Sequence, residues 1–354
     1  MGAHARPNRI HRTGVRIAMV ALVGAALPIS AGGLAQAATP DATHSADENG
    51  RQGGEATSTA AQKHGAQRQS QTSHAAQRVV RGEAAGAQDA NVQDAPQIKA
   101  DHAFLLDARD GSQERELWGG AKADESVSMA STTKIMTALV VLEHPQLLDR
   151  QITVKQEYRD YVQKVGGSTA DLQTGDTLTV EQLLHALLIP SGDDAAMALA
   201  DNLGAGDTEE ARIADFVHQM NVEAQQLGLT GTNFDSFDGV SQGNNHSTAR
   251  DLAKLGQRAM LKPVFADIVK KKQFKTEAVA ANGHIRYYTW NTTNKLLSSY
   301  DGALGIKTGS GPEAGYALVF AAERDNRTLV GAILKDDAGR FDDATKMLDW
   351  GFAH

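Results

Sequence analysis

The order in which apolar patterns change along the chain constrains its fold more than any other feature. Two short apolar runs, 102–107 and 116–118, flank Asp110-Gly111, which is typical of a β-hairpin. A long stretch with helical spacing follows. Three strand-like runs and a final helix then end the sequence, at 303–308, 315–322, 328–334 and 342–352. This order predicts an α+β fold, in which helices flank an antiparallel sheet and an all-helical subdomain of about residues 145–285 is inserted.

Several signals locate individual helices within the predicted subdomain. Thr179 and Gln182 have the spacing of a capping box, and the helix that they open would continue to Leu188. Pro190 interrupts that helix, and residues 191–193 are expected to form a turn before a second helix through Ala200. Further helices are expected at 208–227 and 248–260.

The amino-terminal 97 residues do not resemble a folded domain. Arginines, an apolar core at 17–29 and the small-x-small site Ala35-Gln36-Ala37 predict a signal peptide over 1–37. That core is short for a membrane span, so we expect export with no stable transmembrane span after cleavage. A signal retained as an anchor is the alternative. Residues 38–97 are polar and poor in aromatics, which predicts a disordered linker before a domain over 98–354.

Composition excludes several kinds of chemistry. The 354 residues include no cysteine, which rules out thiol catalysis, cysteine-ligated zinc and disulfide bonds. The twelve histidines show no HxxH or HxxxH pairing, so we expect neither a metal site nor a cofactor. The formal net charge of −8 argues against nucleic acid as a partner.

Ser131 and Lys134 form the first candidate site. They lie three residues apart at the start of a run with helical spacing, so the lysine amine is expected beside the serine hydroxyl. This geometry suits a serine nucleophile that is activated without a histidine. The alternative is a helix-capping serine followed by a surface lysine.

Two later segments strengthen the catalytic interpretation. Ser191-Gly192-Asp193 is expected in a turn, and Lys307-Thr308-Gly309 is expected on a strand. This ordered trio is the set used by penicillin-recognising serine enzymes. The flanking sequences resemble the D-alanyl-D-alanine carboxypeptidase family, the low-molecular-mass penicillin-binding proteins. The resemblance extends over about residues 98–354, and the matching blocks are 130–139, 191–196, 237–239, 247–253, 291–297 and 305–309.

The resemblance implies a serine-type hydrolase with a fold like that of DD-peptidases and β-lactamases. Such an enzyme cleaves the terminal D-Ala-D-Ala bond of the peptidoglycan pentapeptide through an acyl-enzyme. It takes part in cell-wall biogenesis and cell shape, and β-lactams inhibit it covalently. The protein would then be secreted and associated with the cell wall.

The resemblance also assigns roles to residues. Ser131 would be the nucleophile, Lys134 its general base and Ser191 a third catalytic residue. Lys134 must be neutral to act as a base, and burial or a nearby positive charge would favour the neutral amine. The substrate would be bound by the following residues: Asp193, Lys307, Thr308, Gly309 and Ser310. The backbone N–H groups of Ser131 and Ser310 would form the oxyanion hole.

Asp193 departs from the family pattern, in which this position is usually asparagine. An ionised carboxylate cannot donate a hydrogen bond to a substrate carbonyl, and it favours the charged form of Lys134. We therefore expect altered substrate choice or a slower reaction. Participation of the carboxylate in proton transfer and complete loss of catalysis are the two other possibilities.

Three competing functions share these motifs. A class A β-lactamase requires a glutamate that activates the deacylating water, and no Glu-x-x-Leu-Asn segment lies between Asp193 and Lys307. A DD-transpeptidase uses the same acyl-enzyme with an amine acceptor in place of water. A non-catalytic wall-binding homologue is supported only by Asp193.

Overall fold

The computed structural model describes residues 95–108, 115–337 and 339–354. The predicted signal peptide and nearly all of the predicted linker lie outside the described residues. So does the Asp110-Gly111 turn. Those predictions, and the domain limits built on them, stay predictions.

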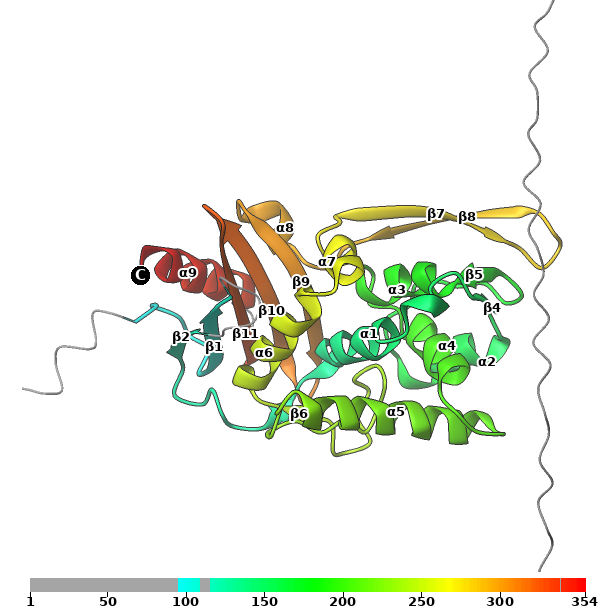
Figure 1. Cartoon of the computed structure of the whole chain (residues 1–354), viewed down its shortest axis with the longest axis horizontal. Helices are drawn as coiled ribbons and strands as arrows, with labels where there is room; N and C mark the ends of the chain where they lie inside the picture. Colours follow the sequence, from blue (N-terminus) through cyan, green and yellow to red (C-terminus); the bar gives the residue numbers. More distant parts are fainter. Residues whose placement is uncertain (1–94, 109–114, 338) are drawn as a thin grey trace, which may run out of the picture. The chain divides into compact units, whose positions relative to one another are not determined.

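A five-stranded antiparallel sheet has the strand order β2-β1-β11-β10-β9. Its strands are β1 (His102–Asp107), β2 (Arg115–Gly119), β9 (Ala303–Gly311), β10 (Gly315–Arg324) and β11 (Arg327–Asp336). The pairing of the two predicted amino-terminal strands and the three predicted carboxyl-terminal strands are therefore confirmed. Because β1 pairs with β11, the two ends of the folded domain meet in one sheet (Figure 1).

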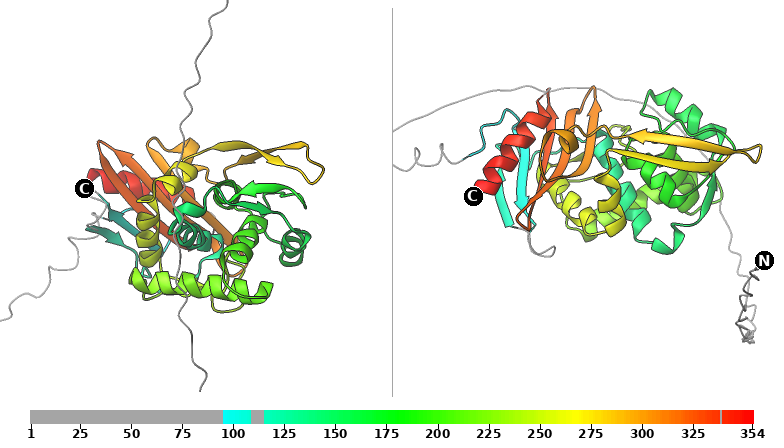
Figure 2. Two further views of the ribbon diagram at one scale, coloured as in Figure 1. Left: turned by 45° about the vertical axis from the view of Figure 1, so that its right-hand side comes forward. Right: turned by 90° about the horizontal axis from the view of Figure 1, so that it is seen from above.

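Helices cover both faces of this sheet. Alternate residues of β1 point to opposite sides, as the pleat requires. Phe104 and Leu106 belong to the apolar cluster that includes α6 (Ala249–Met260), whereas Leu105 belongs to the cluster that includes α9 (Arg340–Ala353). The views in Figures 1 and 2 show α6 and α9 on opposite sides of the sheet. The predicted helix at 342–352 is thus confirmed as α9.

The middle of the chain is mainly helical. Thr179 forms the predicted capping box: its Oγ1 accepts from the N–H of Gln182, whose Oε1 accepts from the N–H of Thr179. The helices predicted at 208–227 and 248–260 are confirmed as α5 and α6. The helices of this region are α1 (Lys134–Leu142), α2 (Gln156–Val165), α3 (Val180–Leu188), α4 (Asp193–Leu203), α5 (Glu209–Gln226) and α7 (Pro263–Val269).

The inserted subdomain is not all-helical, and this part of the prediction is wrong. Its second sheet has the order β4-β5-β7-β8, and the last two strands form a long hairpin (Figure 2). The turn of the hairpin contains Asn282-Gly283, a favoured hairpin dipeptide, with Gly283 at φ +83°. The sheet contains β4 (Gln151–Thr153), β5 (Thr177–Thr179), β7 (Gln273–Val279) and β8 (Ile285–Asn291).

Short elements complete the domain. A two-stranded sheet joins β3 (Val127–Ser128) to β6 (His246–Ser247). The remaining elements are the 3₁₀ turns η1 (Ala130–Thr133) and η2 (Pro145–Leu147) and the helix α8 (Leu296–Ser299). Within the described ranges, no helix is both long and apolar enough to cross a membrane.

Candidate active site

Ser131 lies in η1, the turn that leads into α1. Ala130, just before it, has a left-handed backbone at φ +46°, and Gly239 packs directly against this residue. A Cβ at position 239 would lie 2.1 Å from the carbonyl oxygen of Ala130, and Gly239 itself has φ +100°. Only glycine meets both conditions without strain. The turn that presents Ser131 is therefore fixed from outside by a loop about a hundred residues later.

Lys134 is completely buried beside the serine, as the sequence predicts. Its Nζ lies 3.0 Å from Ser131 Oγ and 2.7 Å from the carbonyl oxygen of Asp238. A third oxygen, Oδ1 of Asp193, forms an ion pair with Nζ at 2.5 Å. A hydroxyl next to a buried lysine amine is the arrangement expected of an activated serine.

Lys307 and Ser191 form a second pair close to the first. The Lys307 ammonium donates to Ser191 Oγ at 2.8 Å and to the carbonyl oxygen of Thr308 at 2.9 Å. The Lys307 residue is 1% exposed. Burial lowers the pKa of Lys307 well below its usual range, and the positive charge of Lys134 lowers it further. Ser191 has φ +71°, which places its hydroxyl in a strained turn before α4.

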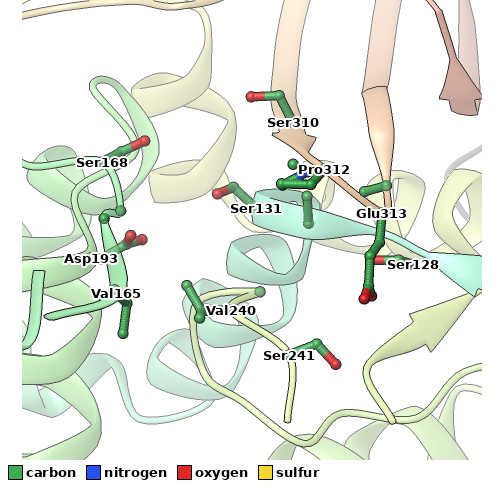
Figure 3. Close-up of a pocket in the computed structure, with 16 residues that line it drawn as sticks. Ser128, Ser131, Val165, Ser168, Asp193, Val240, Ser241, Ser310, Pro312 and Glu313 are labelled. Atoms are coloured by element: carbon green, nitrogen blue, oxygen red, sulfur yellow. The ribbon is translucent and has the colours of Figure 1, made fainter. Parts of the chain in front are cut away.

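An open cleft of about 480 Å³ leads to this cluster (Figure 3). Ser131, Asp193 and Ser310 line the cleft, and Figure 3 shows all three on facing elements. Ser131 and Ser310 come from η1 and β9, whereas Asp193 begins α4. The other predicted residues lie deeper: Lys134, Ser191, Lys307 and Thr308 are buried behind the lining.

Gly309 lies where β9 packs against the serine turn. A Cβ at position 309 would lie 2.9 Å from the carbonyl oxygen of Met129 and 3.2 Å from the N–H nitrogen of Thr132. The absence of a side chain therefore allows the strand to lie against η1. The adjacent Thr308 shares a 2.6 Å hydrogen bond between its Oγ1 and that of Thr293.

Asp238 and Tyr161 are functional candidates that the sequence did not indicate. The Asp238 carboxyl accepts from Tyr161 Oη at 2.7 Å and from the N–H of Val240 at 2.9 Å. Burial raises the pKa of Asp238 to about 6, and the Asp193 carboxylate adds to this while Lys134 opposes it. Burial, with the charge of Asp238, also raises the pKa of Tyr161. The family-like block at 237–239 contained Asp238 but gave it no role, and no signal marked Tyr161.

Two further residues support the site from a distance. Arg340 Nη1 donates to the carbonyl oxygen of Gly309 and, at 2.9 Å, to that of Ala317, which braces β9 against β10. Asn245 Nδ2 donates to Thr133 Oγ1 at 2.9 Å and so supports η1. Neither residue belongs to a motif. Among the described residues, histidine, aspartate and glutamate side chains form no group of three that could hold a metal ion.

Comparison with known proteins agrees with this geometry. The family model described as D-alanyl-D-alanine carboxypeptidase matches residues 89–338. A D-alanyl-D-alanine carboxypeptidase of Streptomyces sp. (strain K15) is 49% identical over 235 residues, which are 65% of this chain and 81% of that protein. The carboxypeptidase DacC of Escherichia coli (strain K12) is 34% identical over 269 residues. That match covers 73% of this chain but only 62% of DacC.

A solved structure provides the matching fold. The crystal structure of the Streptomyces K15 DD-transpeptidase superposes with a TM-score of 0.70 and 47% sequence identity. The superposition covers 73% of this chain and 99% of the solved chain. The expected antiparallel sheet flanked by helices is thus confirmed at the level of the whole fold.

Proposed function

The chain belongs to the D-alanyl-D-alanine carboxypeptidase family, and we propose that Ser131 is the nucleophile of its reaction. It is a serine-type hydrolase of the DD-carboxypeptidase class, whose substrates are peptidoglycan stem peptides. The observation that carries the residue assignment is the 3.0 Å contact between Lys134 Nζ and Ser131 Oγ at the cleft. In this proposal Ser131 attacks the penultimate D-Ala carbonyl, Lys134 takes its proton, and water later releases the acyl group.

The remaining site residues would bind the substrate and guide protons. Ser191, hydrogen-bonded to Lys307, would pass a proton to the leaving D-Ala nitrogen. Lys307 and Thr308 would attract the substrate carboxylate, since an ammonium and a hydroxyl suit that anion. Gly309 would let the substrate backbone approach β9, and the N–H groups of Ser131 and Ser310 would hold the developing oxyanion.

The location of the protein follows from its substrate. We propose an exported enzyme that works at the cell wall on the peptidoglycan pentapeptide. The export signal at 1–37 supports this proposal from the sequence.

Penicillin labelling tests the nucleophile directly. The purified full-length chain should become fluorescent with a labelled penicillin, and Ser131→Ala should abolish the label. Ser299→Ala, at an exposed position of α8, is a matched control that should label normally. D-Ala release from a D-Ala-D-Ala peptide should follow the same pattern. Labelling of Ser131→Ala at the wild-type level would refute the assignment.

Transpeptidation is a second candidate, favoured by the solved Streptomyces K15 structure, which is named a DD-transpeptidase. The acyl-enzyme is the same in both reactions, and only the acceptor differs. Adding an amine acceptor such as a glycyl peptide to the reaction separates the two. A new peptide product at the expense of hydrolysis would identify transpeptidase activity, and unchanged D-Ala release without a new product would identify hydrolysis alone.

A further inference from the structure

Lys134 Nζ is in contact with three oxygen atoms inside the protein. They are Ser131 Oγ at 3.0 Å, the carbonyl oxygen of Asp238 at 2.7 Å and Asp193 Oδ1 at 2.5 Å. A lysine ammonium has three donors and no acceptor. Nζ donates hydrogen bonds to the first two oxygens, whereas Asp193 Oδ1 is held by the ion pair and accepts no hydrogen bond. The side chains of Lys134 and Asp193 are 0% and 3% exposed, so water does not compete for these contacts. An ammonium held in this ion pair cannot act as a base until it gives up a proton.

Only one of the three oxygens can accept a proton from Lys134. Ser131 Oγ already holds the proton that must leave in the reaction, and the Asp238 oxygen is a weakly basic amide carbonyl. The Asp193 carboxylate is a true base in direct contact. We propose that Asp193 is the internal proton acceptor that frees the amine of Lys134, so that the two residues act as one proton-sharing pair. This inference rests on the proposed role of Ser131 and concerns how that serine is activated.

The protons balance over one acylation. A proton first moves from Lys134 to Asp193 and leaves a neutral amine and a neutral carboxylic acid. As Ser131 Oγ bonds to the substrate carbonyl carbon, its proton passes to the Lys134 amine. When the carbon–nitrogen bond breaks, that proton reaches the leaving D-Ala amine, directly or through Ser191. Asp193 then returns its proton to Lys134, so the pair is restored and no proton is exchanged with solvent.

The residues around Asp193 hold its side chain in place. A Cβ on Gly167 would lie 1.9 Å from Asp193 Oδ2, so glycine leaves the space that the carboxylate fills. The N–H of Asp193 donates to the carbonyl oxygen of Ser168 at 2.8 Å and so ties the start of α4 to the loop that contains Gly167. Asp193 also opens α4, where the helix dipole favours a negative charge. These contacts fix Asp193 against Lys134 at the wall of the cleft, with 3% of its side chain exposed.

Four other ionisable groups face the pair or its partners. Asp238 and Tyr161, from the loop after α5 and from α2, bond to each other. Lys307 on β9 bonds to Ser191, and Arg340 on α9 bonds to backbone carbonyls. Burial raises the pKa of Asp238, and the negative charge of Asp193 adds to that rise; burial lowers the pKa of Lys307, and the same charge opposes that fall. Replacing Asp193 with a neutral residue would therefore move the titration of those two groups to lower pH.

The pH dependence of acylation distinguishes this pair from a lysine that acts alone. In the wild type, the pair needs only one proton between its two members, so acylation persists until Asp193 is also protonated at acidic pH. In Asp193→Asn, Lys134 must lose its proton to solvent before it can act. We expect the acid limb of the acylation rate to lie at least about one pH unit higher in Asp193→Asn than in the wild type. At a pH below both limbs, the variant should therefore acylate about tenfold more slowly than the wild type. Titration of Asp238 or Lys307 would shift the limb the opposite way.

The experiment measures the second-order rate constant for acylation of the full-length protein by a chromogenic penicillin between pH 4.5 and 9. Asp171→Asn is the matched control, because this carboxylate is 78% exposed and pairs with Arg159 outside the cleft. Its profile should coincide with the wild type. Circular dichroism establishes that each variant is folded, and Asp193→Ser replaces Asp193→Asn if the latter does not fold. Coincident acid limbs in the wild type and the Asp193 variant would overturn the inference. Absence of any acylation in the folded wild type would instead overturn the proposed role of Ser131.

Discussion

The ion pair between Lys134 and Asp193 allows a quantitative test of how the site is held together. Both side chains are almost fully buried, and Nζ lies 2.5 Å from Oδ1. The relevant scale is therefore that of a broken buried pair, about 3–5 kcal/mol, and not the ~0–1 kcal/mol of a surface pair. Lys134→Met keeps the apolar stem but leaves the Asp193 carboxylate buried without its cation. We expect this variant to lose about 3–5 kcal/mol of unfolding free energy.

A double-mutant cycle separates the pair from other effects of each substitution. Asp193→Asn alone leaves the Lys134 ammonium without its carboxylate and should also be costly. Lys134→Met combined with Asp193→Asn removes both charges, so its loss should be smaller than the sum of the single losses by about 2–3 kcal/mol. Urea unfolding monitored by tryptophan fluorescence at pH 7 provides the four free energies. Losses that add within about 0.5 kcal/mol would refute the view that these groups form a buried, mutually dependent pair.

Three more changes test other parts of the site. Burial raises the pKa of Asp238 from 3.8 to about 6, so this carboxyl binds its proton more tightly in the folded chain. Folding stability should therefore fall by about 3 kcal/mol as the pH rises from about 4 to 7. Asp238→Asn should remove this fall in urea titrations, and an identical slope in the variant would contradict the assignment. Gly239→Ala should lower the rate of penicillin acylation at least about tenfold, because its Cβ would lie 2.1 Å from the carbonyl oxygen of Ala130. A wild-type rate would show that this loop does not fix the serine turn. Lys307→Met should slow acylation by penicillins, which carry a carboxylate, more than acylation by a neutral thioester. Equal slowing would argue against carboxylate binding by Lys307.

The sequence predicted the central sheet and most helices because their signals are local. The hairpin of β1 and β2, the capping box at Thr179 and the apolar strands β9 to β11 each carry their pattern within a few residues. The hairpin of β7 and β8 was missed, although Asn282-Gly283 flanked by alternating residues is a strong hairpin signal. Apolar residues on its exposed face, Val279, Ile285 and Tyr287, obscured that alternation. The strands β4 and β5 have three residues each, which is too short for a periodic pattern.

The site was predicted in part for the same reason. Ser131 and Lys134 are three positions apart on one helical turn, so their spacing alone predicted the contact between them. The pairing of Asp193 with Lys134 was anticipated from the residue type, and the structure adds its distance and its burial. The contact of the Asp238 carbonyl with Lys134 joins residues 104 positions apart. No local pattern encodes such a contact, because it depends on how the loop after α5 folds back over η1.

The central claim is that Ser131 forms a covalent acyl-enzyme. Its most direct test is mass spectrometry of the intact chain after reaction with benzylpenicillin, followed by peptide mapping of the adduct. We predict one added penicillin per chain, located on Ser131, with no adduct in Ser131→Ala. An adduct on another residue, or a folded wild-type chain that gains no mass under these conditions, would contradict the account.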